Sequence, residues 1–228
     1  MKIAEIYGSI QGEGFLTGTA SVFVRASGCN LRCWYCDTPY ASWQPEGDDL
    51  GVDEIFEQVA QLTPDHVVLT GGEPMLFAEL IPLAERLREA GKHITIETAG
   101  TLYLPVECDL MSISPKLAGS TPSLAAAGRW RRRHHRARFV PEVIERLLAE
   151  YAYQLKFVID TPADCDEVEE WLAAFPAIDR GRVLLMPQGR RREELDEREI
   201  WLAPYCLEHG LAYCHRRQIE WFGLVRGT

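Results

Sequence analysis

Short apolar runs and helical apolar stripes alternate along most of the chain. The runs are rich in Val, Ile and Leu and are bounded by polar residues or glycine, a pattern that predicts strands. The predicted strands are residues 2–7, 21–26, 66–69, 93–96, 109–113, 155–159, 183–186 and 211–214. Between them, apolar residues recur every three or four positions, which predicts helices at 53–62, 76–90, 141–151, 168–175 and 195–209.

The alternation of strands and helices predicts a fold class. Strands separated by helices pair in parallel and are joined by right-handed crossovers. A chain of 228 residues without an internal repeat or a low-complexity linker suits one domain. We therefore expect an α/β fold in which about six parallel strands form a partial TIM-like barrel, a (β/α)6 arrangement. A doubly wound open sheet is the alternative that the pattern leaves open.

Polar turns follow directly after four of the predicted strands. They are residues 70–74 (Thr-Gly-Gly-Glu-Pro), 97–100 (Glu-Thr-Ala-Gly), 114–116 (Ser-Pro-Lys) and 186–189 (Met-Pro-Gln-Gly). Because α/β folds place their active sites at the carboxyl ends of parallel strands, these turns should lie on one rim. The sequence therefore predicts a single polar site at that rim.

Three cysteines in one loop are the strongest chemical feature of the sequence. Cys29, Cys33 and Cys36 lie within eight residues, whereas the next cysteine is Cys108 and the nearest histidine is His66. A structural zinc site usually has four ligands. Three thiolates instead suit a [4Fe–4S] cluster, which ordinarily takes four cysteines and would here keep one iron open to another ligand. A zinc site or three unrelated core thiols are the alternatives.

Composition excludes several classes of protein. The hydrophobic content of 46% and charged content of 25% are typical of a globular protein, and no apolar run is long enough to span a membrane. The formal net charge of −10 argues against bulk nucleic-acid binding, because such binding depends on neutralising phosphates. No signal-peptide core is present, so we expect a cytoplasmic protein with reduced thiols.

The cysteine loop resembles the C-x3-C-x-aromatic-C loop of the radical S-adenosylmethionine (SAM) enzymes, with Tyr35 at the aromatic position. The resemblance implies that the open iron binds the amino and carboxylate groups of SAM. Electron transfer through the cluster then cleaves SAM to a 5′-deoxyadenosyl radical. It also implies a SAM-binding set drawn from the cysteine loop and the polar turns: Tyr35, Cys36, Asp37, Gly72, Glu73, Glu97, Ser114, Pro115, Lys116 and Gln188. For Glu73, a carboxylate that merely caps the next helix is the alternative.

Three further stretches make the resemblance specific to one family of these enzymes. They are residues 6–14 (Ile-Tyr-Gly-Ser-Ile-Gln-Gly-Glu-Gly), 22–25 (Val-Phe-Val-Arg) and 36–38 (Cys-Asp-Thr). Together with the polar turns they are similar to the 7-carboxy-7-deazaguanine synthase family. That family converts 6-carboxy-5,6,7,8-tetrahydropterin to 7-carboxy-7-deazaguanine with loss of ammonia, in the synthesis of queuosine and other 7-deazapurines. The resemblance implies a partial barrel of the radical SAM type, a homodimer, Mg²⁺, and a flavodoxin- or ferredoxin-type electron donor.

The same resemblance implies roles for further residues. Thr38 would offer its hydroxyl to Mg²⁺, and Arg25 would bind the carboxylate of the substrate. The implied substrate-binding set is Ile10, Gln11, Gly12, Glu13, Arg25, Thr70, Gln218 and Thr228. The match at Gln218 is weak, and Ala99 stands where the family often has asparagine.

The resemblance thins over residues 117–180, and 117–150 read as an insertion in a single radical SAM core domain (1–228) that ends in a C-terminal extension (211–228). Six of the ten residues from 129 to 138 are arginine. Such a run could bind nucleic acid or an acidic reductase, but is more often a solvated flap. Two other functions remain open: a glycyl-radical-enzyme activase, and a zinc-stabilised RNA-binding module.

Overall fold

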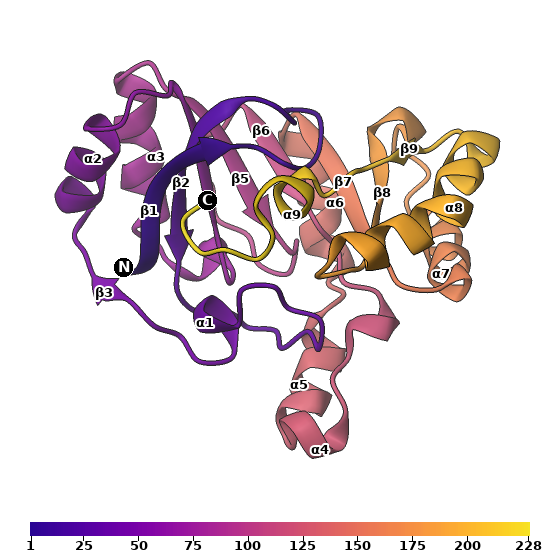
Figure 1. Cartoon of the computed structure of the whole chain (residues 1–228). Helices are drawn as coiled ribbons and strands as arrows, with labels where there is room; N and C mark the ends of the chain where they lie inside the picture. The colour runs from indigo at the N-terminus through magenta and orange to yellow at the C-terminus, as the bar shows by residue number, and fades with distance from the viewer.

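One nine-stranded sheet organises the molecule, and the computed structural model describes all residues from 1 to 228. In spatial order its strands are β3 (Asp48–Asp49), β1 (Lys2–Ile10), β2 (Ala20–Ala26), β4 (His66–Gly71), β5 (His93–Thr98), β6 (Leu110–Ile113), β7 (Tyr153–Ile159), β8 (Val183–Pro187) and β9 (Ala212–Tyr213). In this spatial order, each pair of neighbouring strands from β2–β4 through to β8–β9 is parallel. The curved sheet is not closed into a ring, and the predicted partial barrel is confirmed (Figure 1).

The first strand departs from the parallel pattern. β1 pairs antiparallel with β2, and the short β3 pairs antiparallel with β1. The connection 11–19 contains no helix, and a parallel pair needs a longer crossover. The hairpin therefore brings the loop after β1 back toward the sheet instead of carrying it to the far side.

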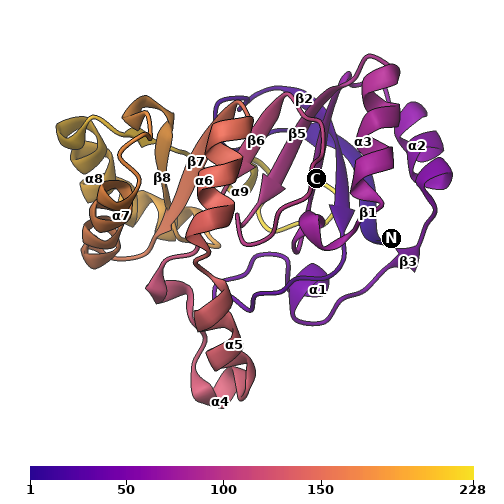
Figure 2. The same ribbon diagram turned by 180° about the vertical axis from the view of Figure 1, so that it is seen from behind.

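Helices cover the convex face of the sheet, as Figures 1 and 2 show from opposite sides. The covering helices are α2 (Val52–Ala60), α3 (Leu80–Glu89), α6 (Pro141–Glu150), α7 (Pro162–Ala174) and α8 (Arg192–His209). The remaining ones are the short α1 (Pro39–Ser42), α4 (Leu124–Ala127), α5 (Trp130–Ala137), α9 (Arg217–Phe222) and the 3₁₀ turns η1 (Pro74–Leu76), η2 (Ala118–Ser120) and η3 (Arg180–Arg182).

Two connections differ from a strict alternation of strand and helix. Residues 99–109 join β5 to β6 without a helix. Leu76, predicted on the stripe of the helix at 76–90, lies instead in η1 and is 43% exposed. The extended backbone of Phe77 (φ −113°, ψ 113°) separates η1 from α3, so that helix begins only at Leu80.

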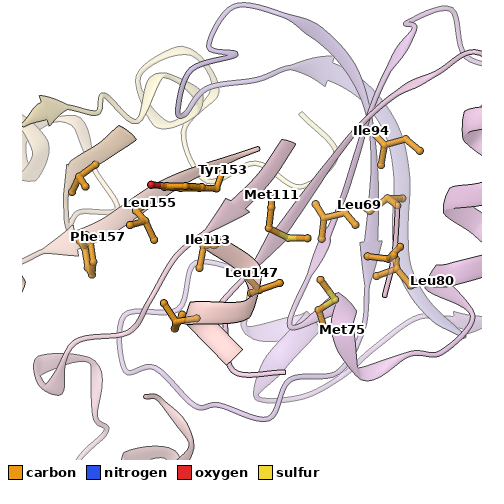
Figure 3. Close-up of a cluster of buried hydrophobic side chains, with 14 of the residues drawn as sticks. Leu69, Met75, Leu80, Ile94, Met111, Ile113, Leu147, Tyr153, Leu155 and Phe157 are labelled. Atoms are coloured by element: carbon orange, nitrogen blue, oxygen red, sulfur yellow. The ribbon is translucent and has the colours of Figure 1, made fainter. Parts of the chain in front are cut away.

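The two-residue period of the strands separates the hydrophobic core from the concave side. On β7, Leu155 and Phe157 are fully buried in the core, while Lys156 and Val158, at the alternate positions, face a cavity. The same alternation recurs along the other parallel strands, and Figure 3 shows the resulting apolar layer between sheet and helices. Its labelled members are Leu69, Met75, Leu80, Ile94, Met111, Ile113, Leu147, Tyr153, Leu155 and Phe157.

The segment 117–150 is structurally mixed. Both views show α4 and α5 projecting from the body of the molecule, beside α1 and the loop before it (Figures 1 and 2). By contrast, Ile144 and Leu147 of α6 are buried in the core. That this segment is an insertion stays a prediction, as do the single-domain boundaries and the C-terminal extension from 211. None of the helices combines the length and apolarity that crossing a membrane requires.

Candidate active site

A cavity of about 320 Å³ occupies the concave side of the sheet. It is lined by side chains of β1 and β2, by the carboxyl ends of β4 to β8, by the cysteine loop and by the C-terminal tail. Figure 1 shows that tail, in yellow, running from α9 across the side of β1 and β2. The predicted rim of polar turns is therefore one continuous site.

The cysteine loop forms one wall of the cavity. Leu31, Cys33, Tyr35 and Cys36 line it, together with Cys29. Among the hydrogen bonds that hold the loop, the Trp43 indole N–H donates to the Cys33 carbonyl (3.0 Å), and the Gly28 N–H donates to the Ala41 carbonyl (2.8 Å). Burial raises the pKa of the Cys29 and Cys33 thiols to about 12, so without a bound cation these two thiols keep their protons.

The chemistry of these thiols fits an iron–sulfur cluster better than a zinc ion. No group of His, Cys, Asp or Glu side chains converges closely enough to hold a single metal ion. All three loop cysteines nevertheless face the same cavity, and no fourth cysteine and no histidine lines it. A cubane places its ligands on separate irons, so it accepts three spaced thiolates and leaves one iron open.

The glycine turn after β4 packs directly against this loop. The Gly72 N–H donates to Ala26 (3.0 Å) and the Glu73 N–H to Gly28 (2.8 Å). A Cβ at Gly72 would lie 2.2 Å from the Gly28 carbonyl oxygen and 2.5 Å from that of Ala41. Only glycine permits this close approach, which joins the turn at 70–74 to the cysteine loop.

The Glu73 carboxylate is used within the chain and does not line the cavity. It is fully buried and accepts hydrogen bonds from Met75 N–H (3.1 Å), the Thr98 hydroxyl (2.8 Å) and Ala99 N–H (2.8 Å). The structure thus shows the capping alternative, in which Glu73 caps η1 and ties it to the end of β5. That Glu73 contacts SAM stays a prediction.

A buried lysine connects two carboxylates that line the cavity. Lys156 Nζ donates to Glu13 Oε2 (3.1 Å) and to Glu97 Oε1 (2.8 Å), and the Thr70 hydroxyl donates to Glu97 Oε2 (2.9 Å). Burial alone would lower the pKa of Lys156, but the two carboxylates outweigh it and raise that pKa. The lysine therefore remains charged and fixes the loop after β1 to the end of β5.

A buried arginine extends this network to the cysteine loop. The Arg216 guanidinium donates to Glu13 Oε1 (3.1 Å), to Asp37 Oδ2 (2.5 Å) and to the Gly189 carbonyl (2.8 Å). Burial by itself would raise the pKa of Glu13, but Lys156 and Arg216 lower it to about 2. Gln218 Nε2 also donates to Glu13 Oε1 (2.5 Å). Glu13 is thus ionised, and its carboxylate accepts three hydrogen bonds, from Lys156, Arg216 and Gln218.

The Arg25 guanidinium lies on the β1–β2 side of the cavity. It donates to Glu5 Oε1 (2.6 Å) and to the Tyr7 hydroxyl (2.9 Å). These contacts use two of its five N–H groups and orient the planar fork. The remaining N–H groups can bind an anion in the cavity.

The structure brings most predicted residues together but not all. Those lining the cavity are Ile10, Gln11, Gly12, Glu13, Arg25, Cys29, Cys33, Tyr35, Cys36, Asp37, Thr38, Thr70, Gly72, Glu97, Ser114, Lys116, Gln218 and Thr228. Lys116 Nζ donates to the Ser114 carbonyl (2.6 Å) and hydroxyl (2.7 Å), which folds that turn onto itself. Glu73, Pro115 and Gln188 do not reach the cavity surface.

Sequence reasoning missed Lys156 and Arg216. Lys156 lies in a mostly apolar strand, and a charged residue at the concave position of a buried strand is a signal that could have identified it. Arg216 has no such signal, because it follows β9 in an irregular segment. Glu5 and Tyr7 also line the cavity, from alternate positions of β1.

Comparison with known proteins agrees with this site. Residues 23–115 match the family model described as the Radical SAM superfamily. The chain is 47% identical over 229 residues to a 7-carboxy-7-deazaguanine synthase of Rhodopirellula baltica, covering 100% of this chain and 89% of that protein. It is 43% identical to the synthase of Halobacterium salinarum, covering 96% of this chain and 89% of that protein. The crystal structure of QueE from Escherichia coli has the same fold, with a TM-score of 0.70, 21% identity, and coverage of 94% of this chain and 92% of that one.

The fold, the cysteine loop and the family match define a radical SAM enzyme, which uses a [4Fe–4S] cluster and SAM. Within that class, the identity over almost the whole chain decides the family. The chain belongs to the 7-carboxy-7-deazaguanine synthase family.

Proposed function

We propose that this chain converts 6-carboxy-5,6,7,8-tetrahydropterin to 7-carboxy-7-deazaguanine with loss of ammonia. The observation that carries the proposal is the ion network of Glu13, Lys156 and Glu97 inside the cavity of the cysteine loop. It fixes an ionised acceptor, Glu13, in the same cavity as the Arg25 guanidinium, which has N–H groups left to donate. This pair suits a heterocycle with N–H donors on one edge and a carboxylate on the other. The reaction is the one named for the relatives that match the whole chain.

The substrate edge is assigned to the loop after β1. Glu13, held ionised by Lys156 and Arg216, would accept hydrogen bonds from the amino and ring N–H groups of the pterin. Gln11 would add an amide contact, and its side chain is already oriented because Nε2 donates to Ser21 Oγ (2.9 Å). Arg25, oriented by Glu5 and Tyr7, would pair with the substrate carboxylate.

SAM is assigned to the wall formed by the cysteine loop and the strand ends. Cys29, Cys33 and Cys36 would hold the cluster, with Tyr35, Asp37, Gly72, Glu97, Ser114 and Lys116 around SAM. When bound, cluster and SAM together supply one-electron cleavage of the sulfonium and hence a 5′-deoxyadenosyl radical. The protein's part is to hold SAM and substrate side by side and to exclude water, to which the C-terminal tail over the cavity contributes.

Magnesium is assigned to the Thr38 hydroxyl. Thr38 lines the cavity between the cysteine loop and α1, and Mg²⁺ takes hard oxygen ligands while retaining waters. A site that also uses substrate oxygens needs no cluster of protein carboxylates, and none is present.

The homodimer implied by the family is supported by one face of α8. Ile200 is 78% exposed and Leu207 is 85% exposed, and their seven-residue spacing places both on the same side of the helix. Exposed apolar faces of this kind mark interaction surfaces. The proposed setting is the cytoplasm, where the loop thiols stay reduced and an electron-carrier protein can serve as reductant.

An anaerobic turnover assay tests the proposal. The cluster-loaded protein is incubated with dithionite, SAM, Mg²⁺ and 6-carboxytetrahydropterin, and 7-carboxy-7-deazaguanine is measured by mass spectrometry. We expect many molecules of product for each molecule of SAM added, because the family regenerates SAM. If product is absent and 5′-deoxyadenosine forms only when a protein substrate is added, the chain is an activase and the proposal is wrong.

A further inference from the structure

The C-terminal tail, residues 223–228, covers the cavity but has few attachments to the rest of the chain. All six of its residues line the cavity, and five of the six are exposed. The tail begins where α9 ends, at Gly223, which has a positive φ of 69°. Beyond Gly223, no backbone group of the tail forms a hydrogen bond with the body of the molecule. The side chain of Arg226 therefore supplies every hydrogen bond and ion pair that attaches this segment.

The Arg226 guanidinium contacts four groups beside β1. It donates to the Ala4 carbonyl (2.9 Å) and to Glu46 Oε2 (3.1 Å), and its Nε lies 3.4 Å from Glu5 Oε2. It also lies over the Tyr40 ring, 4.3 Å from the ring centroid. A bulge in β1 leaves Ala4 without a partner residue in β2, and the Ala4 carbonyl accepts from Arg226 instead. One side chain thus fixes the tail to the strand that carries Glu5.

Glu5 links this attachment to the arginine that is assigned to the substrate. Its Oε1 accepts from Arg25 Nε (2.6 Å) and from the Tyr40 hydroxyl (2.8 Å), and Glu5 and Arg25 lie opposite one another on β1 and β2. The Glu5 side chain is 10% exposed and the Arg25 side chain 15%, so the geometry of this pair depends on its few polar neighbours. Arg226 is the only cation beside Oε2 of Glu5. It therefore fixes the carboxylate in the orientation that holds Arg25.

We propose that Arg226 is a positioning residue that couples closure of the C-terminal tail to recognition of the carboxylate of the substrate. It holds the tail over the cavity and, through Glu5, holds the Arg25 guanidinium in the orientation that receives the carboxylate. This inference rests on the proposed function, in which Arg25 binds that carboxylate. It adds a residue that determines specificity by acting through Glu5 and Arg25.

The charges around Arg25 explain the need for a second arginine. Glu5 alone would neutralise Arg25, so the carboxylate of the substrate would meet a pair without net charge and a neighbouring anion. Arg226 offsets the charge of Glu5 from its other oxygen, which leaves Arg25 positive toward the ligand. Glu46 also contacts Arg226, but it is 56% exposed, so water screens its charge more strongly than that of Glu5. A pterin without a carboxylate gains nothing from this arrangement.

Anaerobic titration calorimetry on the cluster-loaded enzyme tests the inference, with SAM present and no reductant, so that no turnover occurs. The probes are 6-carboxypterin and pterin, which is the same ring without the carboxylate. We expect Arg226→Gln to weaken binding of 6-carboxypterin roughly fivefold to tenfold and to change binding of pterin by less than about twofold. Arg226→Lys keeps the charge and should recover most of the loss. Arg146→Gln is the matched control, because Arg146 also pairs with a glutamate and covers a tyrosine ring but does not line the cavity. It should bind both pterins as the wild type does.

Digestion with chymotrypsin after Leu224, followed by mass spectrometry, measures how firmly the tail is attached. Arg226→Gln should be cleaved several times faster than the wild type, and 6-carboxypterin should slow cleavage of the wild type more than that of the variant.

Three results would overturn the inference: equal losses of affinity for the two pterins in Arg226→Gln, undiminished binding of 6-carboxypterin by that variant, or an unchanged rate of cleavage. A wild type that binds the two pterins equally would also overturn it. A wild type that prefers 6-carboxypterin but makes no deazapurine from the tetrahydro form with dithionite and SAM would instead overturn the proposed function and leave the inference about Arg226 standing.

Discussion

Lys156 Nζ lies 3.1 Å from Glu13 Oε2 across 143 residues of sequence. The contact joins the middle of β7 to the loop after β1, which are brought together only when the sheet curves. The lysine side chain is 3% exposed, so the pair exists in a poorly solvated environment. Through the second bond of Lys156, to Glu97, it ties the loop after β1 to the carboxyl end of β5.

Replacing Lys156 with Met should therefore affect both folding and activity. Removing one partner of a buried ion pair leaves uncompensated charge and costs roughly 3–5 kcal/mol in the free energy of unfolding. Chemical denaturation measures this loss. Lys92→Met is the control, because Lys92 pairs with the exposed Asp65, and such a pair contributes about 0–1 kcal/mol. Equal losses in the two variants would contradict the role assigned to Lys156.

The same pair predicts a direction for acid sensitivity. The pKa of Glu13 is lowered from 4.5 to about 2, so its ionised form stabilises the fold above pH 4.5. That stabilisation is lost as pH falls from 4.5 toward 2. Glu13→Gln should flatten the pH dependence of unfolding in this window, whereas the same change at the exposed Glu142 should leave it unaltered.

Gly72→Ala should separate the glycine turn from the cysteine loop. Its Cβ would meet backbone oxygens of Gly28 and Ala41, so the turn or the loop must move, at a cost of about 1–3 kcal/mol. We expect reduced iron incorporation on anaerobic reconstitution, measured by iron and sulfide analysis. Gly8→Ala is the matched control, since no atom lies within 4 Å of its added Cβ. Full cluster loading in Gly72→Ala would show that the close approach is not needed.

His134 should make the attachment of α5 sensitive to pH. Its Nδ1 accepts from Arg32, so Nε2 carries the proton and donates to Ser120. Burial, aided by Arg138, Lys116 and His135, lowers the pKa of His134 from 6.5 to about 4.

Between those two pH values the unfolded chain binds a proton that the folded chain does not. The free energy of unfolding should therefore fall by up to about 3 kcal/mol as pH decreases from 6.5 to 4. Denaturation across this range, compared with His134→Gln, measures the effect, and His135→Gln at an exposed site is the control. An unchanged pH dependence in His134→Gln would exclude His134 as its source.

Periodicity was sufficient to predict the parallel strands and the covering helices, because each element buries one apolar face. It could not predict that β1 runs antiparallel, since residues 2–7 alternate in the same way whichever direction the strand takes. It also placed Leu76 on a helix, because spacing alone does not reveal the break at Phe77.

The residues of the candidate site likewise divide into those that the sequence predicts and those that it does not. The cysteines and glycine turns were predictable, because their chemistry depends on spacing within a short segment. Lys156 and Arg216 were not predictable, because their function comes from carboxylates that are distant in the sequence. Glu13, for example, lies 143 residues before Lys156. Glu73 illustrates a third case: the motif is present, but its carboxylate is committed to Met75, Thr98 and Ala99.

The central claim is that Cys29, Cys33 and Cys36 hold a cubane cluster whose remaining iron binds SAM. Iron, sulfide and zinc analysis of the anaerobically prepared protein tests it most directly, with electron paramagnetic resonance of the reduced sample before and after SAM is added. We predict about four irons and four sulfides per chain, and a spectrum that SAM changes. A colourless protein that contains one zinc ion per chain, with no signal for SAM to alter, would contradict the account.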